Sequence, residues 1–120
     1  MGRVKSLPLV ACCAPLAEPT LTEAQAADLE RVFKALADRH RVKMLNMIAS
    51  CDDAVCVCDV QEALTLKQST ASYHLKQLVD AGLVVRERRG TYSYYRLEPT
   101  ALDRIADIFR AERPQQLLAS

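Results

Sequence analysis

Residues 59–97 restrict the fold more than any other part of the chain. Apolar spacing predicts a short helix over 59–64 and a longer helix over 68–80, with only three residues between them. Branched and aromatic residues then predict strands over 83–88 and 92–97. Two helices so closely joined and followed by a hairpin indicate a helix-turn-helix unit that carries a β-wing.

Capping and turn residues support these limits. Asp59 is the expected N-cap of the short helix, because a carboxylate can accept hydrogen bonds from first-turn N–H groups. Gly82 is the expected end of the longer helix, because glycine tolerates the left-handed conformation found after a helix C-terminus. Arg89-Gly90-Thr91 is the expected tight turn between the strands.

Two further helices are expected upstream. Thr20 and Glu23 have the spacing of a capping box, and apolar residues continue at helical spacing to about Ala37. Asp38 is a second N-cap candidate, and the helix that it begins should end near Ser50.

A last amphipathic helix is expected after Pro99, which completes the order of a winged helix-turn-helix domain, mainly α with a small β-hairpin. The 120 residues, half of them apolar, fit one domain with its own core. We expect that domain over 21–113, a flexible N-terminal arm with a cysteine pair over 1–20, and a C-terminal tail over 114–120.

Charge is nearly balanced overall, at +1, but residues 67–96 carry six basic against two acidic side chains. A local basic surface is typical of phosphate contact. The longer helix of the pair and the hairpin hold side chains that suit DNA. The candidates for DNA contact are Gln68, Ser69, Thr70, Ser72, Tyr73, His74, Lys76, Arg86, Arg88 and Arg89. The alternative is an ordinary solvated helix face.

Five closely spaced cysteines are Cys12, Cys13, Cys51, Cys56 and Cys58. The odd number is a poor disulfide framework, and Cys56 and Cys58 are too close for easy bridging. If Asp59 caps the helix, both lie in extended chain just before it, where their sulfurs can converge on one soft metal ion. The alternative is buried, inert thiols.

Reduced thiols and the lack of a long apolar run predict a soluble, cytoplasmic protein that does not associate with membranes. Leu9-Val10-Ala11-Cys12 looks like a lipoprotein processing site, but the apolar run before it is too short for a signal. No Ser-His-Asp set or glycine-rich phosphate loop is present, so no enzyme is predicted.

Several segments together resemble the ArsR/SmtB family of metal-sensing repressors. They are Phe33-Lys34-Ala35-Leu36-Ala37-Asp38 with Arg41, Cys56-Val57-Cys58-Asp59-Val60, Ser72-Tyr73-His74-Leu75-Lys76, Ala81-Gly82-Leu83-Val84 and Arg89-Gly90 with Tyr94-Tyr95-Arg96-Leu97. The resemblance implies a homodimeric winged-helix repressor that binds palindromic operator DNA and leaves it when an inducer binds. The family pattern usually has Pro at position 39 and a second His at position 73, where this chain has Arg39 and Tyr73.

The resemblance also implies that the first and last helices form the dimer interface. Apolar stripes agree, because Leu29, Val32 and Phe33 and then Ile105, Ile108 and Phe109 are more than one small domain should bury. The last helix lacks the His pattern of the zinc sensors, so no zinc site is expected between the terminal helices.

The Cys-Val-Cys-Asp segment resembles the inducer sites of arsenic, antimony, cadmium and lead sensors. The arsenic version usually has a third Cys three residues after the second, where this chain has Gln61. Cys12 and Cys13 are therefore the expected further ligands beside Cys56 and Cys58. Cys51 is the alternative, as in family members that combine a Cys-Cys arm with one loop cysteine.

The sequence thus predicts a repressor of an arsenic or heavy-metal resistance operon, released from operator DNA when As(III), or else Sb(III), Cd(II) or Pb(II), binds cysteine thiolates. Two alternatives remain open. One is a redox-sensing repressor whose cysteine pairs form disulfides, and the other is a metal-buffering or structural-zinc protein without an operator.

Overall fold

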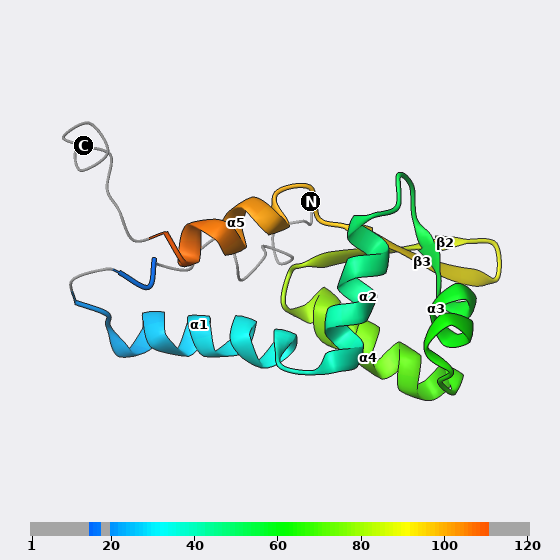
Figure 1. The fold of residues 1–120 in the computed structure, drawn as a ribbon, viewed down its shortest axis with the longest axis horizontal. Helices are drawn as coiled ribbons and strands as arrows, with labels where there is room; N and C mark the ends of the chain where they lie inside the picture. The colour runs from blue at the N-terminus through cyan, green and yellow to red at the C-terminus, as the bar shows by residue number, and fades with distance from the viewer. Residues whose placement is uncertain (1–14, 18–19, 111–120) are drawn as a thin grey trace.

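The computed structural model describes residues 15–17 and 20–110 (Figure 1). In these ranges the elements are α1 (Glu23–Leu36), α2 (Arg39–Ala49), β1 (Val55–Cys56), α3 (Val57–Leu64), α4 (Gln68–Asp80), β2 (Val84–Arg89), β3 (Tyr92–Leu97) and α5 (Ala101–Ile108). This order confirms the predicted fold class. Cys12, Cys13 and the expected tail over 114–120 lie outside the described residues.

The two upstream helices begin at side-chain caps, one of them displaced from its expected place. Thr22 rather than Thr20 caps α1: its hydroxyl accepts from the Gln25 N–H (3.1 Å), and the Gln25 side chain accepts from the Thr22 N–H (2.8 Å). The box therefore starts two residues later, with Gln25 in place of Glu23. Asp38 caps α2 as predicted, with its carboxylate accepting from the N–H groups of His40 and Arg41.

The start of α3 corrects the prediction that Asp59 is its cap. Cys56, in extended conformation, is the N-cap, and its sulfur accepts from the Cys58 N–H (3.2 Å). Asp59 instead lies inside the first turn, where a carboxylate interacts favourably with the positive end of the helix dipole. The helix ends at Thr65, whose left-handed backbone (φ 55°) turns the chain toward α4.

The hairpin of β2 and β3, which we call the wing, has the predicted tight turn, with Gly90 at φ +68° and Arg89 opposite Tyr92. A third strand, β1, pairs antiparallel with the other edge of β3, so the strand order is β1-β3-β2. Strand β1 was not predicted from the sequence, because two residues are too few to show an alternating pattern.

The core lies where α2, α3 and α4 pack together and against the base of the sheet. Met44, Ile48, Leu75, Leu78 and Leu83 are among its fully buried side chains. In the described ranges no helix is both long enough and apolar enough to cross a membrane.

Helices α1 and α5 run beside each other and extend away from the rest of the domain (Figure 1). Their contact includes the rings of Phe33 and Phe109, which stack with centroids 5.7 Å apart. The predicted apolar stripes are only partly exposed, because Leu29, Val32 and Ile108 are already buried within one chain.

Candidate functional site

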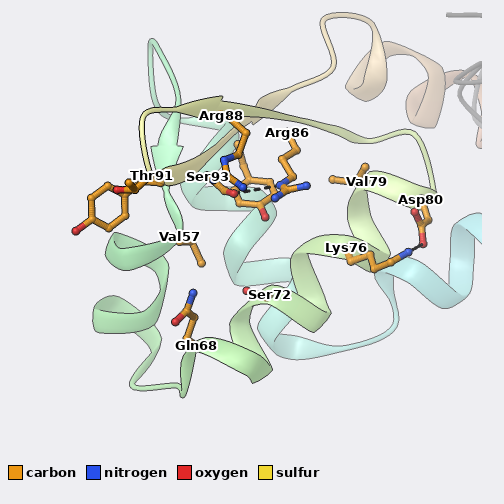
Figure 2. Close-up of a pocket in the computed structure, with 12 residues that line it drawn as sticks. Val57, Gln68, Ser72, Lys76, Val79, Asp80, Arg86, Arg88, Thr91 and Ser93 are labelled. Carbon is orange, nitrogen blue, oxygen red and sulfur yellow. Dashed lines mark hydrogen bonds and ion pairs between the residues drawn. The ribbon is translucent and has the colours of Figure 1, made fainter. Parts of the chain in front are cut away.

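A groove of about 590 Å³ separates α4 from the wing (Figure 2). Polar and basic side chains from both sides line it: Gln68, Ser72 and Lys76 from α4, and Arg86, Arg88 and Ser93 from the wing. The helix-turn-helix positions α4 at the surface, and the antiparallel register of β2 and β3 positions the arginines opposite it.

Helix α4 divides into an apolar and a polar face. Ala71, Leu75 and Leu78 are buried in the core, and this anchors the helix. Six of the predicted DNA contacts on this helix are at least partly accessible: Gln68, Ser69, Thr70, Ser72, Tyr73 and Lys76. The Lys76 ammonium also pairs with the Asp80 carboxylate (2.8 Å).

His74, one of the predicted DNA contacts, lies on the buried face of α4. Its side chain is only 9% exposed and points into the domain, with Nδ1 3.0 Å from the Arg41 guanidinium of α2. Its position in a helix of period 3.6 explains this, because it adjoins Leu75 and Leu78 on the buried face. Tyr73, one position earlier, is 57% exposed and remains available to DNA.

The arginines of β2 divide between the two faces of the wing. Arg86 and Arg88 line the groove, and Arg86 donates to the Ser93 hydroxyl (3.1 Å). Arg89 pairs with Asp53 (3.0 Å) and Glu87 (3.1 Å) and stacks over the Tyr94 ring at 4.7 Å. Strand alternation accounts for the split, because residues 86 and 88 share one face while 87 and 89 share the other.

These ion pairs shift the pKa values of the residues that form them. The Arg89 hydrogen bond lowers the pKa of Asp53, and its bonds to Asp53 and Glu87 raise the pKa of Arg89. Hydrogen bonds from Arg96 and Arg89 lower the pKa of Glu87. Asp53 lies in the loop before β1 and was not a sequence candidate, since its partner is 36 positions away in the chain.

The sulfurs of Cys56 and Cys58 converge at the N-terminus of α3 and are joined as a disulfide. The prediction was that the two are too close for easy bridging, and the structure differs from it. Cys56 is in extended backbone and Cys58 is the second helical residue, so the chain changes direction between them and turns both sulfurs to one side. Cys56 is 4% exposed, whereas Cys58 and the free thiol of Cys51 are exposed.

The cysteine pair is structurally continuous with the groove. Val57, between the two cysteines, lines the groove and lies opposite Gln68 in Figure 2. Cys56 also pairs with Tyr94 of the wing through the β1–β3 ladder. The cysteine pair thus adjoins Val57 in the groove lining and the β1–β3 ladder at the base of the wing.

The outer face of α3 carries a second, shallower hollow of about 490 Å³. Cys58 and Gln61 both line it, since residues three apart lie on one face of a helix. The position at which the arsenic pattern has its third Cys therefore adjoins Cys58.

A helix presented by a helix-turn-helix, a basic wing and the groove between them define a winged helix-turn-helix DNA-binding protein. The arsR family of bacterial regulatory proteins matches residues 38–85. Together with the relatives below, this match shows that the chain belongs to that family. It is a DNA-binding transcription regulator and not an enzyme. This role takes the place of the alternative prediction, a metal-buffering protein without an operator.

The chain is 42% identical over 90 residues to the ArsR2 protein of Halobacterium salinarum, an alignment that covers 75% of this chain and 72% of that protein. It is 46% identical over 68 residues to the arsenical resistance operon repressor of Bacillus subtilis, covering 57% and 64% of the two chains. The homodimeric winged helix-turn-helix DNA-binding domain Mb0332 of Mycobacterium bovis superposes with a TM-score of 0.58 at 30% identity, covering 82% and 86%.

Proposed function

We propose that this chain is a homodimeric repressor of an arsenic or heavy-metal resistance operon, and that As(III) or a similar soft ion releases it from operator DNA. The observation that carries the proposal is the convergence of the Cys56 and Cys58 sulfurs beside the groove. Similarity to the arsenical resistance repressor of Bacillus subtilis supports the same inducer class.

The donor set fits such an ion. Thiolates bind thiophilic ions in preference to hard cations, and the exposed Cys58 gives access from solvent. As(III) takes three thiolates, so one more sulfur must join this pair. We assign it to Cys12 or Cys13, with Cys51 as the alternative ligand. Cd(II), Pb(II) and Sb(III) are the other candidate inducers.

Ligand binding would then weaken DNA binding through the cap of α3. The Cys56 sulfur accepts the Cys58 N–H, so coordination of that sulfur competes with the capping hydrogen bond. Movement of Val57 and of the β1–β3 ladder would follow, and both contribute to the groove walls. Coupling of this kind needs only about 1–3 kcal/mol of differential affinity.

DNA contact is assigned to the exposed face of α4 and to the groove face of the wing. Lys67 provides no side-chain cap for α4, so the first-turn N–H groups of that helix can meet a phosphate. Gln68, Ser69 and Tyr73 are the candidate readers of base edges, and Arg86 and Arg88 the candidate phosphate contacts.

We expect Arg88→Ala to reduce the salt dependence of DNA binding by about one unit of slope, because one phosphate contact is lost. Arg89→Ala should reduce it less, because Asp53 and Glu87 already hold that guanidinium. Fluorescence anisotropy over a salt series measures both slopes. Equal losses in the two variants would contradict this division of the wing. Gln68→Ala should instead relax base preference.

The dimer is assigned to α1 and α5. Phe109 is 57% exposed, Leu102 is exposed, and an apolar groove on α1 is lined by Leu16, Leu21 and Phe33 among others. An apolar surface of this kind is typical of an interface.

We expect the wild-type chain to sediment as a dimer at micromolar concentration and Phe109→Asp to shift it toward monomer, because a charge would be placed in an apolar interface. A control substitution on α3 must avoid the neighbouring Leu64, because that residue packs against the core. Ala63→Asp, at an exposed position on α3, is the matched control and should remain dimeric. A monomeric wild type would contradict the assignment.

The Cys56–Cys58 disulfide favours a second candidate, a repressor that responds to oxidation of this pair. The oxidised pair could not offer two thiolates to an ion, so reductant decides between the functions.

The test begins with a duplex that the reduced wild-type protein selects from random-sequence DNA. Mobility shifts of that complex are then measured with each of the four ions under a phosphine reductant, and with diamide alone. Release by arsenite under reductant supports the proposal. Release by diamide but by none of the ions would establish the redox alternative instead.

A further inference from the structure

Arg41, in the first turn of α2, joins three helices at one point. Its Nε donates to the Ala35 carbonyl (2.8 Å) and its Nη2 to the Lys34 carbonyl (3.2 Å), both at the end of α1. Its Nη1 lies 3.0 Å from Nδ1 of His74 on α4. One side chain therefore connects the end of α1, the start of α2 and the middle of the helix that faces DNA.

The chemistry of the two partners fixes the proton of His74. A guanidinium can only donate hydrogen bonds, so Nδ1 of His74 must accept, and the ring proton lies on Nε2. A protonated imidazole donates from both nitrogens and cannot accept. The bond to Arg41 therefore exists only while His74 is neutral.

Asp38, His40 and His74 place ligand atoms within 4.8 Å of one another, close enough to suggest a metal site. Two observations argue against a cation there. The positive guanidinium of Arg41 already occupies Nδ1 of His74, and Oδ1 of Asp38 accepts from the N–H groups of His40 and Arg41. The cluster is thus arranged around an arginine.

The surroundings of His74 disfavour its protonated form. Burial lowers the pKa of His74, and the charges of Arg41 and His40 lower it further, whereas Asp38 raises it; the net shift is downward. Apart from these α2 groups, the exposed Tyr73 meets the His74 ring edge-on at 5.3 Å. Burial alone would raise the pKa of Asp38, but backbone N–H bonds from Arg41 and His40 lower it below its ordinary value.

We propose that the Arg41–His74 hydrogen bond is a positioning joint that fixes α4 against α1, and that DNA affinity depends on it. The proposal rests on the dimer proposed above. In a dimer held together through α1 and α5, the spacing of the two α4 helices depends on how each α4 is fixed to its own α1. A loosened joint would then misalign the two helices on consecutive major grooves.

The downward shift of the His74 pKa determines how the Arg41–His74 bond should depend on pH. Because the pKa of folded His74 lies below its usual 6.5, the bond and its stabilisation are fully present above that pH. They are lost as the pH falls below 6.5 and through the folded-state pKa.

The test uses the fact that the chain contains only two histidines. His74→Asn keeps an acceptor oxygen near the position of Nδ1 and cannot titrate, and His40→Asn is its matched control. Arg41→Gln removes the charge and the three-way contact. Anisotropy of the selected duplex is measured from about pH 7.5 to about pH 5, and histidine ring NMR signals give the two pKa values directly.

We expect wild type and His40→Asn to lose affinity by roughly tenfold or more on acidification, the range for a hydrogen bond to a charged group. His74→Asn should bind like wild type at the higher pH and keep that affinity at the lower pH. Arg41→Gln should bind weakly throughout and raise the pKa of His74.

A wild-type pH profile in His74→Asn, or an unchanged His74 pKa in Arg41→Gln, would overturn the joint while leaving the proposed function intact. If the wild type selected no duplex at all, the proposed function would fail, and with it the dependence of DNA binding on this bond. The NMR titration separates the two failures.

Discussion

Cys56→Ser and Cys58→Ser proteins are expected to bind the selected duplex like wild type and to lose its release by arsenite. A serine hydroxyl at position 56 can still accept the N–H of residue 58, so the cap of α3 and the groove beside it are preserved. A hydroxyl is, however, a poor ligand for a thiophilic ion.

The expected size of this effect is large. Arsenite should weaken DNA binding of the reduced wild type by roughly 10- to 100-fold, as typical coupling free energies imply, and by less than about twofold in either variant. Anisotropy with and without arsenite measures both values. Cys51→Ser is the matched control and should respond almost normally. Cys51 proving essential while Cys56 and Cys58 are dispensable would move the site to the loop after α2.

Gln61→Cys is expected to restore an arsenite response to a protein in which Cys12 and Cys13 are both serine. Without the two N-terminal thiols, Cys56 and Cys58 leave the site one sulfur short. Gln61 lines the same hollow as Cys58, so a thiol there adjoins the pair from the same face of α3. We expect arsenite release to return to roughly the wild-type range.

Ala63→Cys in the same background is the control for this gain. It adds an exposed thiol to α3, but five helical residues from Cys58 place it on a different face. Rescue by both variants, or by neither, would contradict the proposed geometry. Rescue by Gln61→Cys alone would support a three-thiolate site at the start of α3.

The sequence was sufficient wherever local pattern and tertiary packing agree. Helix α4 has its predicted limits, because Ala71, Leu75 and Leu78 give one apolar face and Gly82 follows its end in the left-handed region (φ +80°). The cap at Asp38 and the turn at Gly90 were likewise predictable, since each depends on the residue at that position.

The start of α3 was not predictable from residue preferences. Capping statistics favour Asp59, but Val57 is buried and is the first residue of α3. The N-cap therefore lies three residues earlier than predicted, at Cys56, whose sulfur acts as the cap acceptor. The same shift brings the two sulfurs together across the start of the helix. The sequence had instead predicted that they converge from one extended segment before Asp59.

Long-range contacts account for the other differences at the site. His74 has the residue type of a base reader, yet Arg41, 33 positions away, holds it inside the domain. Arg89 has the type of a phosphate contact, yet Asp53 binds it on the outer face of the wing. Neither partner can be identified from spacing in a single sequence. The placement of Arg88 and Arg89 on opposite faces of the wing, in contrast, could have been predicted from strand alternation.

In the proposed function, reduced Cys56 and Cys58 bind a thiophilic ion and thereby release DNA. The most direct test is anisotropy of the reduced wild-type complex with its selected duplex during titration with sodium arsenite. A phosphine reductant is kept in excess, because dithiols chelate As(III). We expect saturable release that stops at about one As(III) per cysteine site and is absent in Cys56→Ser. A complex that stays intact through the arsenite titration and dissociates only when the reductant is replaced by diamide would contradict it.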